Sequence, residues 1–74
     1  MPRTPDQAEH MKIVARLKEA RLEAGLDQFS VAESLGKTQS YVSKIESGQR
    51  RFDVLQLKAF AKLYEKPLGY FVGW

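Results

Sequence analysis

The sequence of 74 residues contains no cysteine and only one histidine, His10. The absence of cysteine excludes disulfides and thiolate metal sites, and it is typical of proteins from a reducing cytosol. With a single histidine, one chain cannot form a histidine metal cluster or a Ser-His-Asp triad. No apolar run approaches the ~18 residues of a membrane span, and the N-terminus MPRTPDQAEH lacks the apolar region of a signal peptide. We therefore predict a cytoplasmic protein with no membrane segment, no metal and no other cofactor.

The length and composition indicate one small globular domain. A chain this short buries only about 60–65% of its unfolded surface, so its stability is expected to be marginal. The hydrophobic fraction of 43% argues against disorder for most of the chain. The sequence has no phosphate-cradling glycine loop, no paired carboxylate motif and no nucleophile with a histidine partner. We predict that it is not an enzyme.

The positive charge is concentrated in one stretch. The net charge is +3, and residues 37–51 account for all of it, because the basic and acidic side chains elsewhere cancel. The charged residues of this stretch are Lys37, Lys44, Arg50, Arg51 and Glu46. Such a local excess is the pattern expected of a surface that binds a polyanion, although a solvated basic surface is an equal alternative on charge alone.

Apolar spacing and capping residues predict an all-α chain. The first helix is expected from Lys12 to Ala24, with Ile13, Leu17, Ala20 and Ala24 facing inward. Asp27, Thr38 and Asp53 are suitable N-caps for three further helices. The inward residues expected on those helices are Val31, Ala32, Leu35, Val42, Ile45, Leu57, Phe60, Ala61 and Tyr64. No stretch alternates with the period of a strand.

The two ends of the chain have a different character. Residues 1–9 contain two prolines and few apolar residues, so a flexible leader is expected there, followed by one domain over residues 10–74. The C-terminal octapeptide PLGYFVGW is apolar and uncharged. It either closes the core or offers a surface for a second copy, and we expect Leu68 and Phe71 inward with Tyr70, Val72 and Trp74 forming a dimer interface.

Two short helices joined by LGKT fit the spacing of a helix-turn-helix, whose second helix enters the DNA major groove. The segment GLDQFSVAESLGKTQSYVSKIESGQR resembles the Cro/repressor-type (XRE-type) helix-turn-helix family in the order and spacing of its motif residues. The resemblance implies a compact, lambda-repressor-like DNA-binding domain of four to five helices. It also implies an ion pair between Arg21 and Glu46, which would join the first helix to the third. Phe29 departs from the family pattern, where a small or acidic residue is more common.

The resemblance further implies which residues bind double-stranded DNA. These are Gln28, Thr38, Gln39, Ser40, Tyr41, Ser43 and Lys44. The basic charge of residues 37–51 adds Lys37, Arg50 and Arg51 to the predicted DNA-binding residues. Gln28 either touches a phosphate or reinforces a helix cap, and Tyr41 either packs on the scaffold or lies along the DNA backbone. Gln39 can pair with adenine, and Lys44 reaches either a guanine or a phosphate. Ser40 and Ser43 are base readers, phosphate ligands or spectators. Arg50 and Arg51 favour phosphate, and Phe29 is read as a half-exposed packing residue.

The function predicted from these features is a sequence-specific transcriptional regulator. It would place the third helix in the major groove of a palindromic operator as a homodimer, because one module buries too little surface for tight binding alone. The alternative is an adaptor module or an antitoxin that uses the same scaffold to bind a toxin or another regulated protein. The basic third-helix surface argues for DNA.

Overall fold

The structure, a computed structural model, describes the backbone of residues 5–73 and the side chains of residues 7–73. It contains five helices and, over these residues, no strand. The helices are α1 (Pro5–Glu23), α2 (Gln28–Leu35), α3 (Gln39–Glu46), α4 (Val54–Leu63) and α5 (Leu68–Val72). The all-α prediction is therefore confirmed, and the capping residues Asp27, Thr38 and Asp53 each start the helix expected of them.

The first helix is longer than the sequence pattern indicated. It begins at Pro5 rather than Lys12, so residues 5–9 are helical and do not belong to a flexible leader. Proline is compatible with this position because the first turn of a helix needs no backbone N–H donors. Residues 1–4 of the expected leader lie outside the described residues.

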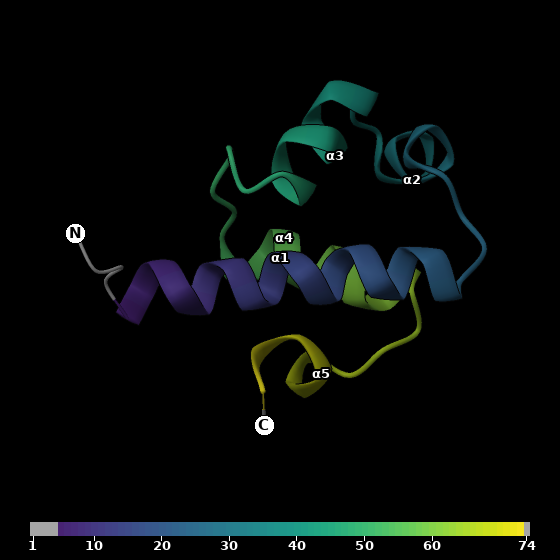
Figure 1. The fold of residues 1–74 in the computed structure, drawn as a ribbon. Helices are drawn as coiled ribbons and strands as arrows, with labels where there is room; N and C mark the ends of the chain where they lie inside the picture. The colour runs from purple at the N-terminus through teal and green to yellow at the C-terminus, as the bar shows by residue number, and fades with distance from the viewer. Residues whose placement is uncertain (1–4, 74) are drawn as a thin grey trace.

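α1 is the element around which the others are arranged. Figure 1 shows α2 and α3 together on one side of α1, with α5 on the opposite side. Contacts join α1 to both α3 and α5, and α4 to α2 and α5. Residues Leu68–Val72 of the C-terminal octapeptide therefore form a short helix that packs on the rest of the domain.

The core lies where these helices meet. Its largest fully buried side chains are Leu17, Val31, Val42, Ile45, Phe60 and Phe71. The expected inward face of α4 is buried as predicted. On α1 the buried stripe is rotated slightly: Val14 and Arg21 are buried, whereas Ala24 is exposed and Ile13 is half-buried.

Candidate nucleic-acid interface

The turn between α2 and α3 is fixed by local hydrogen bonds. Asp27 caps α2 by accepting from the Ser30 N–H at 2.7 Å, and Thr38 Oγ1 caps α3 by accepting from the Tyr41 N–H at 3.1 Å. The bond from Ser30 holds the pKa of the Asp27 carboxyl below its usual value. Gly36 lies between the helices with φ of 68°, a left-handed conformation that glycine reaches without steric cost. The chain therefore passes directly from one capped helix into the next.

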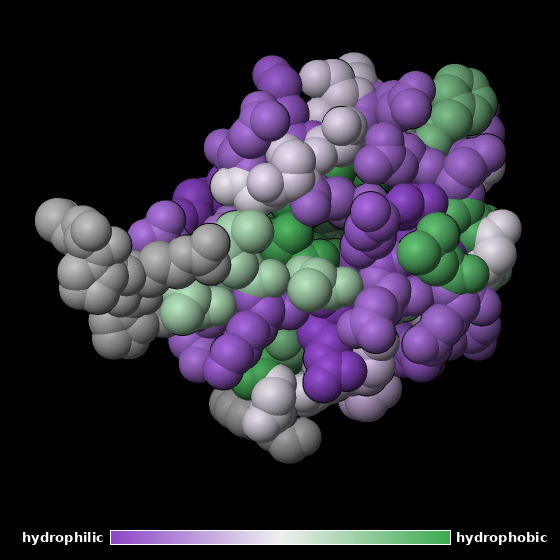
Figure 2. Space-filling view, viewed as in Figure 1, coloured by the Kyte–Doolittle hydropathy of each residue, from purple (hydrophilic) through white to green (hydrophobic). Residues whose placement is uncertain are grey.

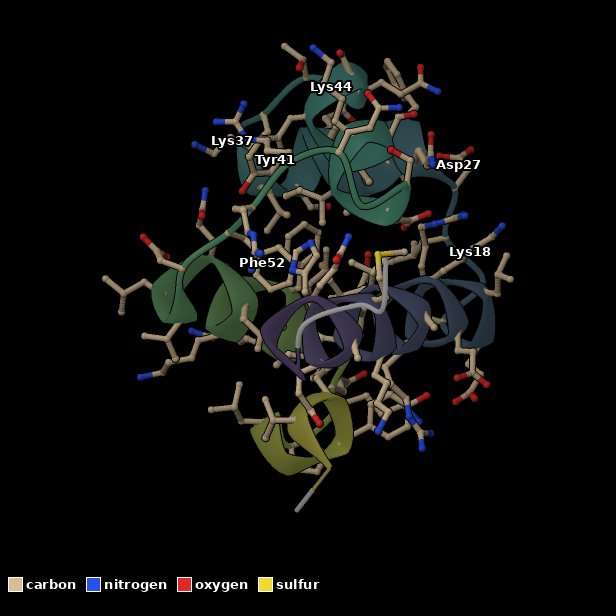
Figure 3. All side chains as sticks on the ribbon, turned by 60° about the vertical axis from the view of Figure 1, so that its left-hand side comes forward. Lys18, Asp27, Lys37, Tyr41, Lys44 and Phe52 are labelled. Carbon is tan, nitrogen blue, oxygen red and sulfur yellow. The ribbon has the colours of Figure 1, made fainter. Side chains whose placement is uncertain are left out.

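α3 has a buried side and an exposed side. Val42 and Ile45 are fully buried, and Tyr41 is 9% exposed at the edge of the core. The exposed side chains at the start and on the outer side of α3 are Thr38, Gln39, Ser40, Ser43 and Lys44. Figure 3 shows Lys44 extending outward from α3, and Figure 2 shows hydrophilic and neutral colours over this helix. The outer side thus presents hydrogen-bonding groups and a positive charge.

The C-terminal end of α3 is tied to α1 by a buried ion pair. Arg21 Nε donates to Glu46 Oε2 at 2.7 Å, and the two side chains are only 10% and 5% exposed. Arg21 Nη1 also donates to the Leu26 carbonyl at 3.0 Å. The hydrogen bond to Glu46 raises the pKa of the Arg21 guanidinium above its usual value, so the guanidinium keeps its charge. This is the pair that the resemblance implied.

Gln28 takes part in the same network. Its Nε2 donates to Glu46 Oε1 at 3.2 Å, and its side chain is half-buried. In this structure Gln28 therefore braces α3 against the start of α2, a role different from both alternatives considered for it. A phosphate contact by Gln28 stays a prediction.

The inward position of Glu46 changes the electrostatics of the surface. It is the only acidic residue among residues 37–51, and its charge is compensated internally by Arg21. The four basic side chains of that stretch, by contrast, are exposed. The outer surface of this segment therefore carries four positive charges and no exposed carboxylate, which is a stronger basic surface than the sequence count indicates.

Two of these cations lie against the ring of Tyr41. Lys37 Nζ is 5.3 Å and Arg50 Cζ 5.1 Å from the ring centroid. The Tyr41 hydroxyl accepts a hydrogen bond from Gln56 Nε2 at 2.8 Å. Of the two alternatives for Tyr41, the structure shows the packed one. Gln56 was not among the predicted site residues, although its place three residues after Asp53 is the signal of a capping box.

Arg51 and Phe29 occupy the margins of this surface. Arg51 is exposed and lies near His10, whose ring packs on Phe52 with centroids 5.2 Å apart. Burial, and then the charge of Arg51, lower the pKa of His10 below its usual value. Phe29 is 62% exposed, so the interpretation of a half-exposed packing residue understated its exposure. Its ring borders a shallow hollow that Thr38 and Gln39 also line.

A family model described as helix-turn-helix matches residues 17–71. Because this match covers most of the chain, the protein belongs to the helix-turn-helix family, of the Cro/repressor (XRE) type that its motif predicted. Members of this family are DNA-binding regulators, and the chain is assigned to that general class. No curated protein and no solved structure matches the chain.

Two other classes of site find no support in the described part of the chain. Residues 5–73 contain no helix that is both long and apolar enough to cross a membrane. Among residues 7–73, whose side chains the structure describes, no group of His, Cys, Asp or Glu is placed to bind a metal ion.

Proposed function

We propose that this protein is a sequence-specific transcriptional regulator that inserts α3 into the DNA major groove and acts in the cytoplasm. The observation that carries the proposal is the charge distribution around α3. The only carboxylate of residues 37–51 is turned inward to Arg21, while four basic side chains remain exposed beside polar side chains. Such a surface attracts the phosphate backbone and leaves hydrogen-bonding groups free for base edges.

Two residues on the exposed side of α3 are the proposed base readers. Gln39 stands at the start of the helix, and a glutamine amide can pair with the N6 and N7 edge of adenine. Lys44 lies five residues further along α3 and can reach the O6 and N7 edge of guanine. Thr38, Ser40 and Ser43 are proposed to support these contacts through phosphates or bases.

The remaining cations are proposed to bind phosphates. Lys37, Arg50 and Arg51 belong to the segments that flank α3 rather than to its outer side, which suits contacts with the DNA backbone. If each of these three residues neutralises one phosphate, log affinity should fall against log salt concentration with a slope of about 2.7 per chain. A slope near this value is expected for any DNA sequence.

Binding-site selection from random duplex DNA tests the base readers. The wild-type protein should enrich one sequence, and Gln39→Ala should lose the preference at one position with a cost of about 1–3 kcal/mol. Lys18→Ala is the matched control, because Lys18 is exposed on α1 and lies away from Lys37 in Figure 3. Enrichment of no sequence by the wild-type protein, or an unchanged preference in Gln39→Ala, would contradict the assignment.

We also propose that the protein binds a palindromic operator as a homodimer. One module buries only about 600–1,000 Å² on DNA, and a symmetric pair would contact half-sites roughly 34–36 Å apart. The proposed interface is the exposed part of the C-terminal segment. Tyr70 and Val72 are half-buried, whereas Phe71 is buried in the core. Trp74, the third residue expected there, lies outside the described residues.

The local surroundings of Tyr70 refine this proposal. Its ring lies 5.1 Å from Arg16 Cζ and 4.8 Å from Lys66 Nζ, so a partner would meet an aromatic ring framed by two cations. Sedimentation of Tyr70→Ala and Trp74→Ala beside the wild-type protein tests the interface. A wild-type protein that stays monomeric on operator DNA would refute the dimer, and folded variants that dimerise normally would exclude this segment.

A further inference from the structure

Tyr41 joins two cations that come from different segments of the chain. Lys37 belongs to the turn before α3, whereas Arg50 belongs to the loop after it. Both charged groups lie within 5.3 Å of the centroid of the same ring. A cation within about 6 Å of an aromatic ring is attracted by the negative face of the ring. The ring therefore ties together two exposed side chains that the backbone does not hold.

The ring itself is held firmly in place. It is 9% exposed and lies parallel to the ring of Phe60, with an interplanar angle of 4° and centroids 6.4 Å apart. Its hydroxyl accepts from Gln56 Nε2 at 2.8 Å. Gln56 is in turn fixed by the capping box of α4, in which it exchanges hydrogen bonds of 2.9 and 2.8 Å with Asp53. The position of the ring is therefore fixed by Phe60 in the core and by Gln56, which is itself held by Asp53.

The charges of Lys37 and Arg50 stay uncompensated. Within residues 7–73, neither side chain forms an ion pair with a carboxylate. A carboxylate partner would orient a cation and also cancel its charge. An aromatic ring orients the cation and leaves its full charge to act on an anion.

We propose that Tyr41 is a positioning residue that holds Lys37 and Arg50 as a two-cation clamp for the DNA backbone. Figure 3 shows Lys37 and Tyr41 together at one edge of the α3 region, while Lys44 extends from another part of it. The clamp rests on the proposed function and specifies how part of it is achieved. Tyr41 acts through the two cations and makes no base contact of its own. Because long cationic side chains lose conformational freedom on binding, ordering them beforehand favours the complex.

The proposed clamp predicts different results for variants that remove a cation and for variants that only release the cations from the ring. Lys37→Ala and Arg50→Ala should each lower the slope of log affinity against log salt by about 0.9, because a phosphate contact is lost. Tyr41→Leu should weaken binding about two- to tenfold for each cation released and leave the slope unchanged, because both charges remain. Tyr41→Phe retains the ring, so its affinity should stay within about twofold of the wild-type value.

A fluorinated ring gives a test that does not depend on folding of the leucine variant. A chain of 74 residues can be made by chemical synthesis with pentafluorophenylalanine at position 41. This ring keeps nearly the shape of phenylalanine but reverses the charge of its face. The fluorinated chain should bind DNA about two- to fivefold more weakly per cation than Tyr41→Phe, with an equal salt slope.

The outcomes distinguish the clamp from the proposed function. If the fluorinated and phenylalanine chains bind DNA equally well, Tyr41 only fills space and the clamp is refuted, while DNA binding itself stands. A Tyr41→Leu variant that is folded, by circular dichroism, and binds like the wild-type protein would refute it too. A wild-type chain with no salt-dependent affinity for any duplex would overturn the proposed function and the clamp together.

Discussion

Replacing Arg21 by methionine should destabilise the domain strongly. The guanidinium donates to Glu46 at 2.7 Å and to the Leu26 carbonyl at 3.0 Å, and the Glu46 side chain is only 5% exposed. In Arg21→Met the carboxylate would stay buried with Gln28 as its only remaining donor among the described residues. Removing one partner of a buried ion pair costs about 3–5 kcal/mol. A domain of 74 residues has a total stability of about 4–11 kcal/mol, so this variant should be close to unfolding.

The double replacement should recover much of this loss. When Glu46→Met accompanies Arg21→Met, no buried charge is left unpaired, and two apolar side chains of similar length fill the space. Such replacements of buried ion pairs are often neutral or stabilising. The double variant should therefore be at least about 2 kcal/mol more stable than the sum of the single effects predicts.

Urea unfolding followed by circular dichroism measures all four proteins of this cycle. Lys12→Met is a matched control, because the Lys12–Glu9 contact of 3.8 Å joins side chains that are 74% and 63% exposed. An exposed pair of this kind contributes about 0–1 kcal/mol. If the Arg21 and Glu46 effects add to within about 0.5 kcal/mol, the pair does not couple the two helices and the reasoning fails.

Three further predictions concern individual residues. Glu65 follows Tyr64, the C-cap of α4, and has φ of 56°, so Glu65→Gly should stabilise the domain by about 0.5–1 kcal/mol, whereas Gly25→Ala, at φ of 73°, should destabilise it. The Tyr64 hydroxyl is buried without a hydrogen-bond partner among the described residues, so Tyr64→Phe should leave stability unchanged or raise it by up to about 2 kcal/mol in the same urea measurement. The pKa of His10 is lower in the fold than its usual 6.5, so the unfolded chain binds the proton more readily. Stability should therefore decrease as pH falls below about 6.5, and His10→Gln should remove that part of the decrease.

Each of these predictions has a clear contrary result. A loss of stability in Glu65→Gly would mean that the glutamate side chain contributes more than its backbone conformation costs. A loss above about 1 kcal/mol in Tyr64→Phe would mean that the hydroxyl has a partner. An identical pH profile between 7 and 5.5 for the wild-type protein and His10→Gln would mean that the histidine is as easily protonated in the fold as outside it.

The helices that carry the site could be predicted because their starts depend on neighbouring residues. Asp27, Thr38 and Asp53 each accept a hydrogen bond from a backbone N–H three residues later. Such a contact depends on only a few adjacent residues of the sequence. The fold family could be recognised for the same reason, since its motif lies in one continuous segment.

The features that were missed depend on the position of a residue within its helix or on contacts between distant segments. The prolines near the N-terminus indicated a break, but Pro5 begins α1, where the missing N–H has no cost. α5 has only five residues and no side-chain cap, so its helical form depends on packing against α1 and α4. The tie from Gln56 to Tyr41 joins α4 to α3, and no local pattern predicts it.

The position of Glu46 shows why the charge of a segment is a poor measure of the field at its surface. The sequence count treats Glu46 as one negative charge against four positive ones in residues 37–51. In the fold this carboxylate is covered and paired with Arg21, so it orients α3 instead of weakening the basic surface. Two of the cations, Lys37 and Arg50, lie instead over an aromatic ring, which leaves their charge intact. The ion pair thus fixes the orientation of α3, whereas the cation–π contacts hold two of the positive charges that we propose bind DNA.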